Sequence, residues 1–330
     1  MIYIEPAFSE YYKKYPLVLV DVGASGGLNF NWQPAKKYLQ IIGFEPDKRE
    51  FANLEKRANN NIKYLNIALY KEKASLDFYL TKKQQTSSIF KPNREFLDKF
   101  ERSERFNIVG ISKLEVDAID NLFGMHNIND ADFMKIDTQG SEYFVLQGAK
   151  DTIKKCIFGI EVEAEFVELY QDQPLFAEVD SFVRKQGFHM FDIQGGYWKR
   201  AIGKDYGKKK GQLVWGNVLY LRKSEDFCKV INEIKCIDER KSKALKAISI
   251  CFFYGYFDYA MEIFSVLSHL FNTAERQMIK KTIKCKVDYG TRIREFRGRE
   301  RLSNILYFLW ELLRPTCRGW GVVDKKLGNT

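Results

Sequence analysis

A glycine-rich turn after the first long apolar run constrains the fold of this chain more than any other feature. The run Leu17 to Val20 leads into Asp21-Val22-Gly23-Ala24-Ser25-Gly26-Gly27. A second apolar run, Ile41-Ile42-Gly43-Phe44, ends in Glu45. In open α/β sheets, a strand, a glycine loop, a helix and a strand with an acidic end form a nucleoside site at the carboxyl ends of the strands. The sequence therefore predicts such a site here.

Composition is typical of a globular protein without a membrane span. The 330 residues are 45% hydrophobic and 29% charged, which suits a large domain and a smaller one. The longest uncharged apolar stretch, residues 247–257, is shorter than a bilayer requires. The six cysteines form no CxxC pair, and the N-terminus lacks the pattern of a signal peptide. We expect a cytoplasmic protein with reduced thiols.

Apolar runs alternate with helical patterns up to residue 224, which is typical of a mostly parallel sheet. Expected strands lie near residues 17–22, 40–45, 62–68, 131–137, 157–163, 187–193 and 213–221. Expected helices lie near residues 47–59, 140–150 and 174–186. An extra strand pair is expected at 75–80 and 108–116, and the polar stretch 81–107 between them is expected to form a loop over the active face.

The pattern changes to helices only after Lys223, so two domains are expected, at residues 1–224 and 225–330. The second part holds 20 basic and 13 acidic residues, a net charge of +7 out of the +10 of the whole chain. An aromatic, basic helix is expected within 301–314. Its apolar stripe indicates packing in the core, contact with a second copy, or peripheral contact with the inner membrane face. Nucleic acid is not expected as a partner.

The glycine register distinguishes between two nucleoside ligands. The dinucleotide fingerprint is GxGxxG, whereas here Gly23 is followed by two other residues and then by Gly26 and Gly27. S-adenosylmethionine has no pyrophosphate and needs only close backbone approach. We expect Gly23, Ala24, Ser25 and Gly26 to provide that approach. Asp21 is expected to receive the ammonium group, and Glu45 to bind the ribose hydroxyls.

Carboxylates at the ends of two later strands are candidate bases. Asp137 ends one apolar strand, and Glu161 and Glu163 end the next, two positions apart and therefore on one face. A base near an acceptor hydroxyl assists group transfer to that oxygen by removing its proton. Lys135 shares a face with Asp137 and is expected to pair with an acid. Acidic oxygens suit a divalent ion, but no metal site is predicted.

These segments together resemble FkbM-type S-adenosylmethionine-dependent methyltransferases over residues 15–222. The resemblance is carried by Val20 to Gly27, Phe44-Glu45-Pro46, Asn66 to Leu69, Ser87-Ser88-Ile89, Leu114 to Asp117, Lys135 to Glu142 and Glu161 to Tyr170. It implies a class I methyltransferase fold, α/β and Rossmann-like, whose seven-stranded sheet has an antiparallel last strand. An all-α C-terminal domain falls outside the resemblance.

The same resemblance implies methyl transfer from S-adenosylmethionine to a hydroxyl of a saccharide, glycan or similar small-molecule acceptor. It implies cofactor contacts from Pro46, Ala68 and Asp137, and acceptor contacts from four further residues, namely Ser87, Ser88, Lys135 and Gln139. An NAD(P)-dependent oxidoreductase and a non-catalytic binding protein on the same fold remain the alternatives.

Overall fold

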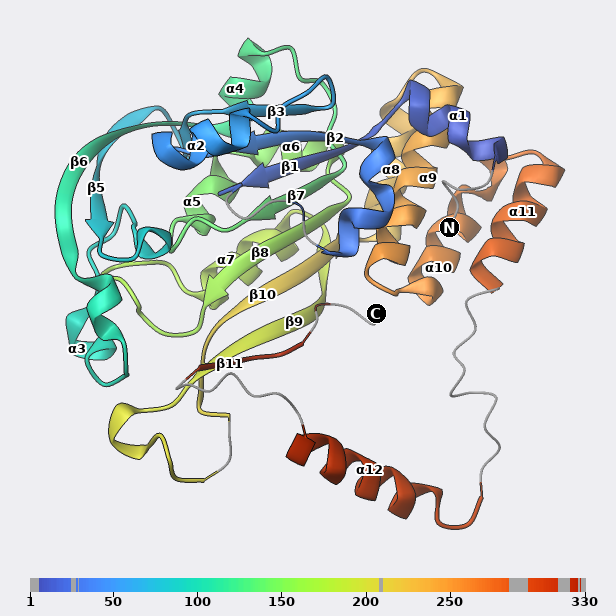
Figure 1. Cartoon of the computed structure of the whole chain (residues 1–330). Helices are drawn as coiled ribbons and strands as arrows, with labels where there is room; N and C mark the ends of the chain where they lie inside the picture. The colour runs from blue at the N-terminus through green and yellow to red at the C-terminus, as the bar shows by residue number, and fades with distance from the viewer. Residues whose placement is uncertain are drawn as a thin grey trace.

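The computed structural model describes residues 6–24, 28, 30–207, 210–284, 296–313, 321–325 and 327 (Figure 1). Its strands are β1 (Leu17–Val22), β2 (Leu39–Phe44), β3 (Ile62–Leu65), β4 (Ala68–Leu69), β5 (Ala74–Thr81), β6 (Ile108–Asp117), β7 (Phe133–Ile136), β8 (Gly159–Glu165), β9 (Phe188–Trp198), β10 (Gln212–Arg222) and β11 (Gly321–Val323). Its α-helices are α1 (Pro6–Lys14), α2 (Lys48–Glu55), α3 (Arg94–Leu97), α4 (Ile119–Met125), α5 (Glu142–Gln147), α6 (Lys150–Cys156), α7 (Phe176–Lys185), α8 (Ser224–Glu233), α9 (Ile237–Phe253), α10 (Phe257–Leu267), α11 (Thr273–Lys284) and α12 (Arg299–Leu313).

The large sheet has the strand order β11-β9-β10-β8-β7-β1-β2-β3 within the described residues. Neighbours from β8 to β3 are parallel, whereas β10 runs antiparallel to both β8 and β9. The sheet thus has eight strands instead of the expected seven, because β11 pairs with β9 at the edge. The segment after residue 224 was expected to contain only helices. This expectation is wrong, because the segment also supplies β11.

Helices cover both faces of this sheet, and strand alternation assigns the core residues to each face. Leu19 and Phe133 belong to a core that includes residues of α1 and α8–α11. Val20 and Met134, their chain neighbours, belong to the other core, with residues of α4–α7. The helices that follow β10 therefore share an apolar core with the sheet.

A second, three-stranded sheet has the order β4-β6-β5. The expected strand pair at 75–80 and 108–116 is present, as antiparallel β5 and β6. The expected strand at 62–68 is divided, because β3 joins the large sheet and β4 pairs with β6. The expected helix at 140–150 is likewise divided, into α5 and α6. The stretch 81–107 contains the short helix α3 and two 3₁₀ turns, Gln84–Thr86 and Ser103–Phe106.

Candidate functional site

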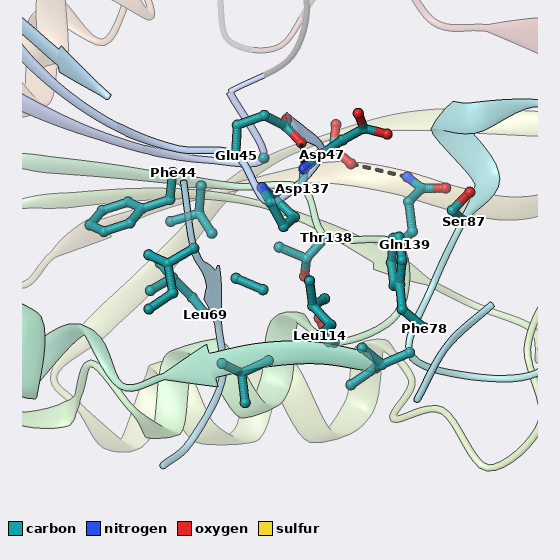
Figure 2. Close-up of a pocket in the computed structure, with 18 of the residues that line it drawn as sticks. Phe44, Glu45, Asp47, Leu69, Phe78, Ser87, Leu114, Asp137, Thr138 and Gln139 are labelled. Atoms are coloured by element: carbon teal, nitrogen blue, oxygen red, sulfur yellow. Dashed lines mark hydrogen bonds between the residues drawn. The ribbon is translucent and has the colours of Figure 1, made fainter. Parts of the chain in front are cut away.

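A cavity of about 470 Å³ lies at the carboxyl ends of β1, β2 and β7, between the two sheets. This volume falls within the usual range for small-molecule sites. Acidic side chains lie at one side of the cavity, and apolar side chains including Phe44, Leu69 and Leu114 lie at another (Figure 2). Polar uncharged groups complete the wall, contributed by Gln84, Gln85, Ser87, Thr138, Gln139 and Ser141.

Gly23 makes the turn at the end of β1 that opens the cavity. Its φ is +76°, a left-handed conformation that favours glycine. A Cβ atom at this position would lie 2.0 Å from the carbonyl oxygen of Asp137. The Gly23 amide donates to the carbonyl of Phe44 at 3.0 Å, so the turn also joins the ends of β1 and β2. Only glycine permits this close approach of three strand ends.

Glu45 follows β2 and lines the cavity. Its Oε1 accepts a 2.9 Å hydrogen bond from the Asp47 amide, and Asn66 Nδ2 donates to the Glu45 carbonyl at 2.8 Å. Burial, together with the charges of Asp47 and Glu50, raises the pKa of Glu45 to about 7, although the hydrogen bond from the Asp47 amide opposes this shift. A ligand that donates hydrogen bonds to this carboxylate therefore competes with a proton near neutral pH.

This competition predicts a pH dependence of S-adenosylhomocysteine binding. Ribose hydroxyls donate to the ionised carboxylate, so affinity should fall as pH decreases below about 7, by up to roughly tenfold per pH unit. Above about pH 7 the affinity should level off, because Glu45 is already ionised. Titration calorimetry between about pH 6 and about pH 8 measures the slope. Glu45→Gln should remove it, and an equal slope in that variant would contradict the assignment.

A row of charged residues crosses the sheet beside the cavity. Asp21, Lys135 and Glu161 lie opposite one another on β1, β7 and β8. Their side chains lie on the same face of the sheet as those of Leu19 and Phe133, which are two positions earlier on β1 and β7. Lys135 Nζ lies 3.7 Å from Asp21 Oδ1 and 4.0 Å from an oxygen of Asp137.

Lys135 is the cation that holds these acids together. Burial alone would lower the pKa of Lys135, but the surrounding carboxylates, Asp21 first, raise it above its ordinary value. Burial raises the pKa of Asp21, and the Lys135 charge opposes that shift. Lys135 therefore stays charged and partly neutralises the carboxylates next to the cavity.

Glu161 is held by the C-terminal helices instead of facing the cavity. Its Oε2 accepts a 2.7 Å hydrogen bond from the hydroxyl of Tyr254, directly after α9. Trp32 Nε1 donates to the same hydroxyl at 3.1 Å, and the Tyr254 ring stacks on Phe133. Burial raises the pKa of Glu161, and the Tyr254 hydrogen bond lowers it.

Asp137 and Glu163 are joined through one amide. Gln139 Nε2 donates to Asp137 Oδ1 at 3.0 Å (Figure 2) and to Glu163 Oε1 at 2.9 Å. Burial and the Asp137 charge raise the pKa of Glu163 well above its ordinary value. Of these two carboxylates, Asp137 belongs to the described lining of the cavity and Glu163 does not.

The turn after β7 fixes the position of Gln139. Gln139 has a φ of +59°, an uncommon conformation for a residue other than glycine. The carboxylate of Glu142 accepts from the amides of Thr138 and Gly140 at 2.6 and 2.9 Å. Ser88 Oγ donates to the Gln139 carbonyl at 2.7 Å. These bonds hold a strained backbone in place, so that the Gln139 amide stays between the two carboxylates.

The expected site residues divide into those that line the cavity and those behind its wall. The described lining includes Gly23, Glu45, Pro46, Ala68, Ser87, Asp137 and Gln139. It does not include Asp21, Ala24, Ser88, Lys135, Glu161 or Glu163. Ala24 and Ser88 are almost fully buried. Ser25 and Gly26 lie outside the described residues.

Several lining residues were not singled out from the sequence. Leu69, Leu114 and Val116 lie within segments on which the family resemblance is based, so the sequence did contain a pattern that could have identified them. Asp47 and Thr138 directly follow singled-out residues. No sequence pattern identified Phe78 of β5 as a lining residue, because only the pairing of β5 with β6 brings it to the cavity.

Comparison with protein families identifies the family of this chain. A model described as the methyltransferase FkbM domain matches residues 21–190, more than half of the chain. The chain belongs to the FkbM methyltransferase family. No match was found among curated proteins.

Solved structures of methyltransferases are also similar. The FkbM methyltransferase of Methylobacillus flagellatus KT is 15% identical, with a TM-score of 0.35. That match covers 62% of this chain and 43% of the other, so this chain matches less than half of that protein. A putative S-adenosylmethionine-dependent methyltransferase from Listeria monocytogenes is 8% identical, with a TM-score of 0.33 and coverages of 66% and 96%. The N-terminal domain of EvdMO1, solved in the presence of SAH and D-fucose, is 11% identical, with a TM-score of 0.30 and coverages of 66% and 79%.

Two further properties concern metals and membranes. Within the described residues, no three histidine, cysteine or acidic side chains are grouped so that they could hold a metal ion. In the same part of the FkbM-family chain, every helix is too short or too polar to cross a bilayer.

Proposed function

We propose that this chain transfers a methyl group from S-adenosylmethionine to a hydroxyl of a saccharide-type acceptor. The observation that carries the proposal is that one cavity contains both Glu45, at the end of β2, and Asp137, directly after β7. Glu45 is suited to ribose hydroxyls, and Asp137 to the proton of an acceptor hydroxyl. Membership of the FkbM family supports methyl transfer over the alternative of hydride transfer.

The residues around the cavity fit the cofactor. Gly23 lines the cavity and has no side chain, so a ligand can approach its backbone closely. Glu45 and Pro46 lie on one side of the cavity, and Phe44, Leu69 and Leu114 give an apolar surface suited to a purine ring. The described part of the wall thus combines a hydrogen-bond acceptor for ribose with an apolar surface for adenine.

Bound S-adenosylmethionine supplies a methyl carbon that an oxygen nucleophile attacks while the bond from carbon to sulfur breaks. Asp137 takes the proton of the acceptor hydroxyl, so a methyl ether and S-adenosylhomocysteine are formed, and the proton later leaves to solvent. Gln139 keeps one Asp137 oxygen occupied, which fixes the carboxylate. Lys135 stays cationic behind Asp137 and limits the repulsion between the acids. Positioning of this kind contributes much of the rate in displacement reactions.

The polar part of the wall favours a hydroxyl-rich acceptor. Amides and hydroxyls from Gln85, Ser87 and Thr138 can each donate and accept hydrogen bonds. Sugar hydroxyls have the same dual character. A panel of glycans and monosaccharides, with a matched panel of amines, tests this point by mass spectrometry of the methylated products. We expect methyl ethers, and products methylated only on nitrogen or carbon would contradict the proposal.

Asp137→Asn tests the assignment of the base. The variant should lower the transfer rate by about 10²- to 10⁴-fold, the usual contribution of general base catalysis, and should leave affinity for S-adenosylhomocysteine nearly unchanged. Radiolabelled methyl transfer and calorimetry measure the two quantities. Asp47→Asn, which removes a cavity acid beside Glu45, is the comparison and should reduce the rate far less. Equal losses in both variants would remove Asp137 from this role.

A further inference from the structure

Helix α12 exposes a large apolar surface. Eight apolar side chains on it are between 38% and 80% exposed, namely Leu302, Ile305, Leu306, Tyr307, Phe308, Leu309, Trp310 and Leu313. At about 100° per residue, all of them except Tyr307 fall within an arc of about 200°. Glu300, Ser303 and Asn304 occupy the opposite side. An apolar surface of this size usually marks an interaction site.

The position of α12 leaves this surface accessible. Figure 1 shows α12 apart from the large sheet and from helices α8–α11. Beyond the helix, the Nζ of Lys325 lies 4.8 Å from the centre of the Trp310 ring. Lys325 closely follows β11, which is the edge strand of the large sheet and pairs with β9. The helix is therefore tethered close to the sheet edge without being packed into either core.

Basic residues lie at the N-terminus of α12, where they do not stabilise the helix. Arg297 precedes the helix, and Arg299 and Arg301 lie in its first turn. Cations at the N-terminus of a helix are unfavourable to the helix dipole. On the helical wheel, Arg299 and Arg301 fall close to the two borders of the apolar arc, where long side chains can extend toward charged groups at an interface. Arg314 and Arg318 follow in the sequence.

We propose that α12 is an interfacial helix that docks the chain on the surface of a bilayer containing anionic lipids. Trp310, at one border of the arc, is suited to the level of the headgroups, and the arginines complement anionic headgroups. A second copy of the chain would more readily bury a narrow stripe than an arc of about 200°. The helix lies on the surface, since it is too short to span a bilayer.

The connection between α12 and β11 indicates which edge of the protein faces the lipid surface. Gly321, the first residue of β11, pairs with Trp198 at the end of β9. Gln212 pairs with the same Trp198, and β10 from there runs along β8 from its carboxyl end. The chain therefore returns from α12 at the edge formed by the carboxyl ends of the parallel strands, where the cavity also lies. Docking through α12 brings that edge close to the lipid surface.

Vesicle sedimentation of the full chain tests this proposal independently of methyl transfer. We expect binding to vesicles of phosphatidylcholine and phosphatidylglycerol at low salt, weaker binding at high salt, and much weaker binding to pure phosphatidylcholine. The double variant Leu306→Glu/Leu309→Glu should lose at least about tenfold in affinity. Arg299→Gln/Arg301→Gln should lose about tenfold on the anionic vesicles only.

The matched control removes two exposed apolar residues elsewhere. Val109→Glu/Ile111→Glu changes side chains of β6 that are 67% and 61% exposed, and it should bind vesicles as the natural chain does. Calorimetry with S-adenosylhomocysteine and thermal unfolding show whether each variant is folded. Absence of binding to anionic vesicles, or equal binding to neutral vesicles, would overturn the proposal. It would also be overturned if the natural chain bound no vesicles but formed a dimer in sedimentation velocity, and if Leu306→Glu/Leu309→Glu dissociated that dimer.

Discussion

Gly23→Ala is expected to reduce S-adenosylhomocysteine affinity by more than about 100-fold, one of the two largest effects on ligand binding that the structure predicts. A left-handed backbone conformation costs a residue with a side chain about 1–3 kcal/mol. The added Cβ would also lie 2.0 Å from the Asp137 carbonyl oxygen, so the ends of β1 and β7 must move apart. That displacement disturbs the turn and Asp137 together, on two sides of one cavity.

Calorimetry and thermal unfolding together test this prediction. The melting temperature should fall in Gly23→Ala, and the protein that remains folded should bind S-adenosylhomocysteine poorly. Gly124→Ala is the matched control, because a Cβ atom there meets no atom within 4 Å. Gly124 lies in α4, where alanine favours the helix, so this variant should be neutral or slightly stabilising. Unchanged binding in Gly23→Ala would show that the turn does not form part of the ligand site.

The second large effect is expected from Glu45→Gln, which should weaken S-adenosylhomocysteine binding by about 100-fold. A hydrogen bond to a charged group contributes about 1.5–3 kcal/mol, and ribose offers two hydroxyls to one carboxylate. Glutamine keeps the size of the side chain but replaces one acceptor oxygen with a donor. The loss therefore reports hydrogen bonding to ribose and not a change in packing.

A second cavity acid separates hydrogen bonding from the general effect of negative charge. Glu50→Gln removes an equal charge from the cavity wall and should weaken binding much less than Glu45→Gln. Competition with adenosine gives a further check, since Glu45→Gln should lose affinity for adenosine and for S-adenosylhomocysteine in parallel. Similar losses in Glu45→Gln and Glu50→Gln would assign the effect to charge and contradict the role given to Glu45.

The sheet was predictable where local patterns decide the structure. β1 occupies the expected residues 17–22, and β2, β7, β8 and β10 lie within two residues of expectation. Buried strands give continuous apolar runs, which a sequence shows directly. The division of the strand expected at 62–68 was not predictable, because Asn66 turns the chain by bonding the carbonyls of Glu45 and Pro46. Strand β11 was not predictable for a similar reason, since its partner β9 is distant in the sequence.

The sequence predicted which strand ends form the site, but not the contacts of each side chain. A spacing of two places Glu161 and Glu163 on one face, as the structure shows. Glu163 contacts Gln139, whereas Glu161 accepts from Tyr254, 93 positions further along the chain. Lys135 was expected to pair with an acid and lies between Asp21 and Asp137. Contacts over such separations come from packing, and one sequence does not show them.

The helices after β10 contribute to the site although the family match ends at residue 190. Tyr254 bonds Glu161 and stacks on Phe133, and Trp32 donates to its hydroxyl. The charged row on β1, β7 and β8 is thus closed on one side by a residue of the C-terminal helices. The expected boundary at residue 224 follows a change in secondary structure, whereas the apolar core continues across it.

Titration of the full chain with S-adenosylhomocysteine tests most directly whether this cavity is a nucleoside site for methyl transfer. We expect saturable binding of one molecule per chain, weaker at pH values below about 7, because the ribose hydroxyls need the ionised Glu45. NADH, titrated in parallel, should not compete. Absence of saturable binding at millimolar S-adenosylhomocysteine, or its displacement by NADH, would contradict the account.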